Sequence, residues 1–242
     1  LAAPHDFQVI QDLAGVGLAY KLAYALCETG DEPSGSDSLA GKTLDLVALG
    51  TVADMAPLLG ENRSLVRSGI EVIHSQSRQG IVSLAGAAGI TPKLVTAADI
   101  GFMLGPRLNA AGRLDSAWRA LKLLTTTDIA EAGRLSQELN NQNQERQKLT
   151  QEIQEKAYQQ ALSRDPEALL LFAADSSFNP GVVGLAASRL SERFYRPAIV
   201  AHMAGGFTRG SCRSIPEYHI TQALDTCADL LEKYGGHAAA AG

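Results

Sequence analysis

The stretch D-I-A-E-A-G-R-L-S-Q-E-L-N-N-Q-N-Q-E-R-Q-K-L-T-Q-E-I-Q-E-K-A-Y-Q-Q-A-L-S, residues 128–163, decides how the chain is divided. It has one glycine and no proline, and Asp128 can cap its start, so it predicts one long helix. Its two ends carry apolar side chains, whereas residues 140–148 are polar without interruption. A helix that is polar on all sides in its middle is typical of a bridge between domains. We therefore expect three parts, namely residues 1–127, a bridging helix at 128–164, and residues 165–242.

The part after this helix has the order strand, helix, strand. Residues 169–172 (L-L-L-F) predict a buried strand, residues 181–194 an amphipathic helix, and residues 197–200 a second strand. This order implies parallel strands with a right-handed crossover. Residues 207–214 (F-T-R-G-S-C-R-S) predict a further strand. On it Ser211 and Arg213 point the same way, because they are two residues apart.

The part before the bridging helix also predicts an α/β arrangement. Residues 44–49 (L-D-L-V-A-L) indicate a strand buried on both faces, as in a parallel sheet. Asp54 would lie just beyond its carboxyl end, where ligands collect in such sheets, although a helix cap or a surface acid is equally compatible. The expected fold class is thus α/β, with two domains of mostly parallel sheets, the long polar helix between them, and an active-site groove between the domains.

Helices are expected on both sides of a segment with two arginines, G-P-R-L-N-A-A-G-R-L-D at residues 105–115. Thr96-Ala-Ala-Asp99 resembles a capping box that opens the helix before this segment, and residues 116–124 form the helix after it. Arg107 and Arg113 carry planar guanidinium groups suited to phosphate or carboxylate. A tight connection with solvated or paired arginines explains the same residues, since glycine and asparagine are common in turns.

Two further places in the second half are candidates for ligand binding. Asn179-Pro-Gly181 stands where a helix start exposes backbone N–H groups, which is a natural anion site. A helix over residues 221–234 would be closed by Gly235 as its left-handed final residue. Gly235 and Gly236 have no side chains and would leave the His237 imidazole accessible to a ligand, although a core histidine is also compatible.

Composition limits the class of protein. The chain has 242 residues, a net charge of −5 and 19% charged residues, which is ordinary for globular domains and argues against a broadly basic surface. No apolar run is long enough to span a bilayer, and the first residues do not read as a signal peptide. Three widely spaced cysteines without a C-x-x-C pair suit a reduced compartment. We expect a cytoplasmic monomer, and a central piece of a longer protein.

Taken together, six motifs occur in the order seen in the RecJ family of single-strand-specific DNA exonucleases, within the DHH phosphoesterase superfamily. They are G-T-V-A-D (50–54), the two-arginine segment (105–115), N-Q-E-R-Q (143–147), N-P-G-V-V-G-L-A-A-S-R-L (179–190), G-S-C-R-S-I-P (210–216) and K-Y-G-G-H (233–237). L-A-G-V-G-L-A-Y (13–20) also resembles that family. The resemblance covers nearly the whole chain.

The resemblance implies a metal-dependent 5′-to-3′ exonuclease that releases mononucleotides from single-stranded DNA in repair and recombination. Asp54 would bind a catalytic Mn²⁺ or Mg²⁺ ion, one of two, and His237 would face the scissile phosphate. The remaining implied substrate contacts are Arg107, Asn109, Arg113, Asn179, Gly181, Ser211, Arg213, Gly235 and Gly236. Further partners would be a single-strand-binding protein or a helicase, with no membrane.

One departure from the family pattern matters. No D-H-H motif and no comparable D-x-D motif occurs, so most metal ligands would lie upstream of this stretch, and an OB-fold domain is absent. The chain alone is therefore expected to be inactive. Two alternatives stay open: a phosphoesterase of the same superfamily that acts on short oligonucleotides or dinucleotides, and a non-catalytic homologue that binds single strands.

Overall fold

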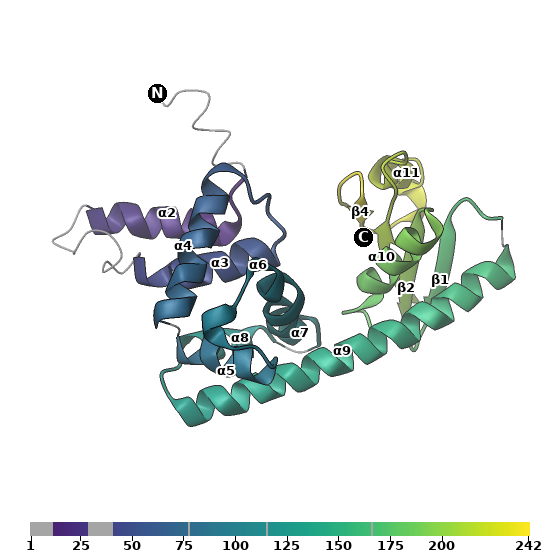
Figure 1. The fold of residues 1–242 in the computed structure, drawn as a ribbon. Coiled ribbons are helices and arrows are strands. Elements are labelled where there is room, and N and C mark those ends of the chain that lie inside the picture. The colour runs from purple at the N-terminus through teal and green to yellow at the C-terminus, as the bar shows by residue number, and fades with distance from the viewer. Residues whose placement is uncertain (1–11, 29–40, 77, 115, 166) are drawn as a thin grey trace, which may run out of the picture. The chain divides into compact units, whose positions relative to one another are not determined.

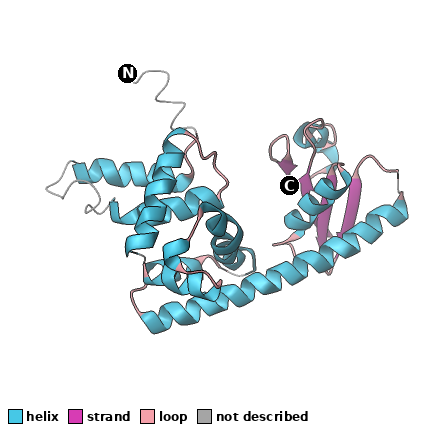
Figure 2. Cartoon of the chain, in the orientation of Figure 1, coloured by secondary structure: helices cyan, strands magenta, loops and turns pink. Residues whose placement is uncertain are grey.

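The computed structural model describes residues 12–28, 41–76, 78–114, 116–165 and 167–242. The chain divides into two compact units, Leu1–Asn143 and Gln144–Gly242. The division falls inside the long helix α9 (Ile129–Arg164), which confirms the single helix expected at 128–163. Strands are found only in the second unit among the described residues (Figure 2).

The first unit is helical throughout its described part (Figure 1). Its α-helices are α2 (Gly15–Glu28), α3 (Leu44–Ala53), α4 (Gly60–Gln76), α5 (Gln79–Ala87), α6 (Ala97–Asp99), α7 (Gly105–Leu114), α8 (Trp118–Thr125) and the first part of α9. Short 3₁₀ turns lie at Gly41–Thr43 and Pro92–Leu94, and a π-helical turn covers Ile100–Leu104.

The strand expected at residues 44–49 was wrong, because these residues open helix α3. A short run of apolar residues fits a buried helix as well as a buried strand. Here the helix is surrounded by α2, α4, the π-helical turn and α7, and Val47, Ala48 and Leu49 are all buried. A helix enclosed on every side needs no polar face, so its sequence lacks helical periodicity.

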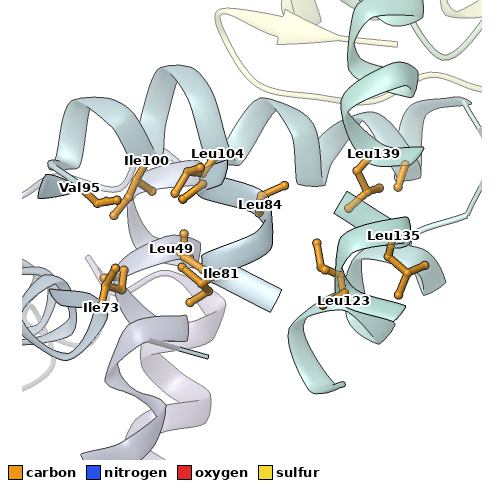
Figure 3. Close-up of a cluster of buried hydrophobic side chains, with 14 of the residues drawn as sticks. Leu49, Ile73, Ile81, Leu84, Val95, Ile100, Leu104, Leu123, Leu135 and Leu139 are labelled. Carbon is orange, nitrogen blue, oxygen red and sulfur yellow. The ribbon is translucent and has the colours of Figure 1, made fainter. Parts of the chain in front are cut away.

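The core of the first unit joins helices that lie far apart in the sequence. Figure 3 shows side chains from α3, α4, α5, the π-helical turn, α8 and α9 meeting in one cluster. The largest fully buried members are Ile73, Ile81, Leu84, Ile100, Leu104, Leu123 and Leu139. Burial of each such side chain contributes about 1.5–3 kcal/mol. The apolar start of α9 is thereby anchored in this unit.

The two-arginine segment is helix α7 and not a connection between helices. The capping box is confirmed, since Thr96 Oγ1 accepts from the Asp99 backbone N–H and Asp99 Oδ2 accepts from that of Thr96. The chain then runs through the π-helical turn, where the Gly105 N–H donates to the Ile100 carbonyl. Pro106 has no N–H to donate, so the helix widens just before it and continues.

The second unit contains one four-stranded sheet in the order β1 (Leu171–Asp175), β2 (Ala198–Ala204), β3 (Phe207–Arg213), β4 (Ala240–Ala241). The parallel pairing of β1 with β2 is confirmed, with helix α10 (Val183–Phe194) as the crossover. The other two pairings are antiparallel. The sheet is therefore mixed, and the expectation of mostly parallel sheets was wrong.

The long last helix was also wrong. Residues 221–234 form only α11 (Ile220–Asp225) and a 3₁₀ turn at Ala228–Leu230. His219 caps α11, as its Nδ1 accepts from the Gln222 N–H at 3.2 Å. Gly235 is not in the left-handed region but pairs with Gly242 through two backbone hydrogen bonds of 3.0 and 2.9 Å. No helix in the part of the chain that the structure describes could cross a membrane.

Candidate nucleic-acid interface

Helix α7 presents an exposed polar face that carries Asn109 and Arg113. These residues are four apart and therefore lie one above the other on the helix surface. Gly112 lies beside them and is also exposed, so a ligand can approach the backbone there. Ala111 lies on the opposite side of the helix and is fully buried in the core, and Ala110 is fully buried as well. Within the described residues, the Arg113 side chain makes no hydrogen bond or ion pair, which leaves its guanidinium available.

Arg107 on the same helix is placed differently. Its Nε donates to Oδ1 of Asn140 at 3.1 Å, and its Nη1 donates to the Met103 carbonyl at 2.7 Å. Asn140 belongs to α9 and is 8% exposed. Burial lowers the pKa of the Arg107 guanidinium from its ordinary value. The two arginines expected to act together thus occupy unlike environments.

Asp54 lies directly after helix α3 and is exposed, and its backbone N–H donates to the Gly50 carbonyl at 2.9 Å. The expectation that it follows a strand was wrong, because α3 replaces that strand. Ala53 lies against Gly105, where an added Cβ would approach the Ala53 Cβ to 3.2 Å. The end of α3 that carries Asp54 is therefore packed against the start of α7.

In the second unit, Ser211 and Arg213 lie on the same face of β3, as expected from their spacing, and α10 packs on this strand. Gly184 in α10 comes close to both: a Cβ there would lie 3.1 Å from Nη2 of Arg213 and 3.3 Å from Oγ of Ser211. Arg213 Nη1 donates to the Cys212 carbonyl at 2.8 Å. A hydroxyl and a guanidinium are thus held side by side under the first turn of a helix.

A hairpin brings His237 to the same strand. Residues 235–237 turn back on residues 240–242, and the His237 N–H donates to the Ala240 carbonyl at 2.8 Å. Ala240 pairs with Arg213 across β3 and β4. Thr221 Oγ1 donates to the His237 carbonyl at 2.7 Å, so the backbone is fixed while the imidazole stays exposed. Ser211, Arg213 and His237 are therefore carried by adjoining parts of one sheet.

The first turn of α10 is partly occupied by its own side chain. Asn179 Oδ1 accepts from the Gly181 N–H at 2.8 Å, and the Asn179 carbonyl accepts from the N–H groups of Val182 and Val183. The Gly181 N–H expected to face an anion is satisfied within this turn. Asn179 and Gly181 form the entry to α10, which places Gly184 over Arg213.

The described residues do not fit a divalent metal site. Outside the undescribed positions, no three histidine, cysteine, aspartate or glutamate side chains come together in a way that could hold an ion. Mn²⁺ and Mg²⁺ need several oxygen or nitrogen donors, and the exposed Asp54 supplies one carboxylate. A metal centre would need donors from beyond the described residues.

Sequence reasoning missed two residues at these places. Asn140 lies in a run of nine polar residues and cannot be distinguished there from the solvated positions around it. Gly184 lies in the quoted segment 179–190, but its importance depends on which strand passes under it. Asn140 lies four residues after Ser136 and eight after Ala132, on the buried side of α9, but Ser136 is itself polar, so no apolar spacing indicates Asn140.

Comparison with known proteins decides the relationship. A family model described as DHHA1 domain matches residues 167–242. RecJ, the single-stranded-DNA-specific exonuclease, is 39% identical in Bacillus subtilis over 96% of this chain, and 41% identical in Escherichia coli over 96%. Thermus thermophilus RecJ in complex with Mn²⁺ superposes with a TM-score of 0.84 at 40% identity, over 95% of this chain and 33% of that one. Over nearly its whole length, the chain is homologous to RecJ.

The match covers a part of RecJ. The chain spans 29% of the B. subtilis protein and 43% of the E. coli protein. Another RecJ structure, bound to manganese, has a TM-score of 0.80 and 39% identity, with 95% of this chain and 56% of that one covered. A further T. thermophilus RecJ structure is a complex with Mg²⁺. The DHHA1 match lies within the second unit, which holds Ser211, Arg213 and His237.

Proposed function

We propose that this chain is the DNA-contacting core of a RecJ-type exonuclease, and that both units carry residues that bind single-stranded DNA. The observation that carries the proposal is the placement of Ser211 and Arg213 on β3, and of His237 in the hairpin that leads into β4, in a chain homologous to RecJ along 95% of its length. A hydroxyl beside a guanidinium suits an oxygen-rich anion such as phosphate, and the exposed His237 imidazole is carried by the neighbouring hairpin.

In this proposal, Arg113 and Asn109 bind the phosphate backbone from α7. Arg213 and Ser211 bind a phosphate, in the whole enzyme the 5′ phosphate. Asn179, Gly181, Gly235 and Gly236 shape the backbone around that site, and His237 faces the scissile phosphate. Phosphate neutralisation by arginine supplies most of the affinity of sequence-independent nucleic-acid binding and makes it sensitive to salt.

The whole protein would hydrolyse single-stranded DNA from its 5′ end with a divalent metal, in repair and recombination in the cytoplasm. Asp54 would contribute one carboxylate to a metal centre, and the other donors would come from outside the described residues. The chain alone would then bind single strands as a monomer without cleaving them. Release of mononucleotides from single-stranded DNA by this chain with Mn²⁺ would contradict that part.

Binding of a 5′-phosphorylated oligothymidylate, followed by fluorescence anisotropy over a salt series, tests the proposal. Arg213→Ala and Arg113→Ala should each weaken binding about tenfold or more, as expected for a lost charged hydrogen bond. Each should also reduce the salt slope by about 0.7, the value for one phosphate contact on a single strand. Arg189→Ala is the matched control, because Arg189 is exposed on α10 and pairs with Glu192.

Equal binding of a duplex and a single strand would contradict the single-strand preference. If a 5′ phosphate on the oligonucleotide strengthens binding by the unsubstituted chain but not by Arg213→Ala, this would support the assignment of Ser211 and Arg213 to the 5′ phosphate. A second candidate is a non-catalytic homologue that binds single strands through the same residues. It is distinguished by testing the full-length protein for cleavage.

A further inference from the structure

Helix α7 presents its two arginines on different sides. Arg107 and Arg113 are six residues apart, and at 3.6 residues per turn their side chains point about 120° apart around the axis. Arg113 shares its side with Asn109 and is exposed, whereas the Arg107 side faces α9. The two side chains therefore have different surroundings and different tasks.

The Arg107 guanidinium links three pieces of the first unit. Through Nε it reaches Asn140 of α9 at 3.1 Å, and through Nη1 it reaches the Met103 carbonyl in the π-helical turn at 2.7 Å. Asn140 is 8% exposed and is the partner that Nε would lose if α9 moved away. Two donors of the planar fork are thus used within the protein, in directions that fix the side chain.

The contact sits at the point where the helix is irregular. The π-helical turn ends at Leu104, and Pro106 has no N–H for the carbonyls of that turn. On the opposite side, Gly105 lies against α3, where an added Cβ would approach the Ala53 Cβ to 3.2 Å, and the same Cβ would lie 3.0 Å from the Ile100 carbonyl of the π-helical turn. Helix α7 is therefore held by α3 through Gly105 and by α9 through Arg107.

We infer that Arg107 is a positioning residue that, with Asn140, sets the orientation of α7 so that Asn109 and Arg113 face the DNA strand, and that it does not bind phosphate. The inference rests on the proposed function of the Asn109 and Arg113 face. It reassigns Arg107, which the resemblance placed among the substrate contacts, and it gives Asn140 a role. Asn140, an uncharged residue of α9 that would not touch DNA, then influences DNA affinity through Arg107.

The test is anisotropy binding of the same oligothymidylate by the 242-residue chain over a salt series, with thermal unfolding of each variant as a fold check. Asn140→Ala and Arg107→Ala should each weaken binding roughly three- to tenfold, equivalent to about one hydrogen bond. The double variant should bind DNA no more weakly than the single variant with the lower affinity, because each single substitution already removes the hydrogen bond between Arg107 and Asn140. None of these should change the salt slope, whereas Arg113→Ala should reduce it by about 0.7.

Controls separate this role from charge and from general stability. Asn141→Ala removes an exposed neighbour on α9 whose side chain accepts a hydrogen bond from Gln137, and should bind as the unsubstituted chain does. Arg67→Ala removes a surface charge on α4 that pairs with Glu71. Arg107→Lys keeps the charge but lacks the planar fork, so it should bind as poorly as Arg107→Ala and remain informative if that variant fails to fold.

Three outcomes would overturn the inference. A reduced salt slope for Arg107→Ala with normal binding by Asn140→Ala and Arg107→Lys would make Arg107 a phosphate ligand. Lower unfolding temperatures with unchanged affinity would make the link merely structural. Absence of single-strand binding by the unsubstituted chain would instead overturn the proposed function, and this inference with it.

Discussion

Gly184 of α10 lies against Arg213 of β3, so closely that a methyl group on the glycine would be 3.1 Å from the guanidinium Nη2. The same methyl group would be 3.3 Å from the Ser211 hydroxyl. The absence of a side chain at Gly184 therefore decides how much room the hydroxyl and guanidinium have. Strand β2 lies between α10 and β3 in the chain, so the contact between Gly184 and Arg213 depends on how the sheet is assembled.

Gly184→Ala should weaken single-strand binding by up to about tenfold while the fold is kept. The guanidinium is the end of a flexible side chain and can move aside, at the cost of its place next to Ser211. The loss should be smaller than that of Arg213→Ala, measured by anisotropy. Arg189→Ala, at an exposed position of α10 that pairs with Glu192, serves as control, and unchanged affinity in Gly184→Ala would show that Arg213 acts from another position.

Gly236→Ala should destabilise the hairpin that carries His237. Gly236 has φ = +155°, and a Cβ there would overlap the Ala240 carbonyl and lie 2.5 Å from the Ala241 Cα, which are backbone atoms that cannot turn away. We expect a loss of about 1–3 kcal/mol in the free energy of unfolding. Hydrogen exchange should also show faster exchange of the Gly242 N–H, which donates to Gly235 at 2.9 Å.

The neighbouring glycine provides the comparison. A Cβ on Gly235 would meet no atom within 4 Å. Gly235→Ala should therefore leave the unfolding free energy within about 0.5 kcal/mol of the original, as for an ordinary surface change. Equal effects of the two substitutions would contradict the close approach at Gly236.

Gly69→Ala should destabilise the first unit. A Cβ on Gly69 would overlap the Leu44 carbonyl oxygen and lie 2.6 Å from the Ala48 Cβ, so helices α3 and α4 would have to separate. Overpacking of this kind costs about 1–3 kcal/mol. Gly133→Ala on α9 meets no atom within 4 Å and should instead stabilise the helix by about 0.5–1 kcal/mol. Chemical denaturation of both variants should show a decrease in the free energy of unfolding for Gly69→Ala and an increase for Gly133→Ala.

The contribution of Asp45 to the free energy of unfolding should decrease as the pH rises from acidic values. Its carboxylate is 1% exposed, and burial raises its pKa despite Arg78, whose Nε lies 2.7 Å from Oδ2 without an aligned hydrogen bond. A raised pKa means that the folded state holds the proton more tightly than the unfolded one. The resulting stabilisation is complete below the unfolded pKa, near 3.9, and is lost as the pH rises through the folded pKa.

Asp45→Asn removes this titration. The unfolding free energy of the unsubstituted chain, minus that of Asp45→Asn, should decrease with rising pH across this window, measured by urea denaturation at a series of pH values. A difference that increases with pH would mean that attraction to Arg78 outweighs burial. The matched substitution Asp229→Asn, at an exposed acid, should show no comparable trend.

The elements that could be predicted from the sequence are those with a local signal. The absence of proline in residues 128–163 predicts α9, and the Thr96 and Asp99 pair predicts the capping box, because both depend on neighbours within a few residues. The spacing of Ser211 and Arg213 predicts their common face for the same reason. Residues 44–49 misled, because burial on all sides removes the periodicity that separates a helix from a strand.

The segment 105–115 misled in the opposite way. Glycine and asparagine are common in turns, yet here Gly105 permits a close approach to Ala53 and Asn109 is an exposed helix residue. Neither fact is encoded within the segment. Both depend on α3 and on the buried side of α7, which come from the rest of the unit.

The sequence by itself determined the long helix, the crossover in the second unit and the chemical groups that can bind phosphate, because side-chain chemistry and helix signals are local. Only the tertiary structure decided which groups are available. Arg107 is engaged by Asn140 and Met103, Arg113 is free among the described residues, and Gly184 lies over Arg213. These differences arise from contacts between residues distant in the chain, which no spacing within a motif records.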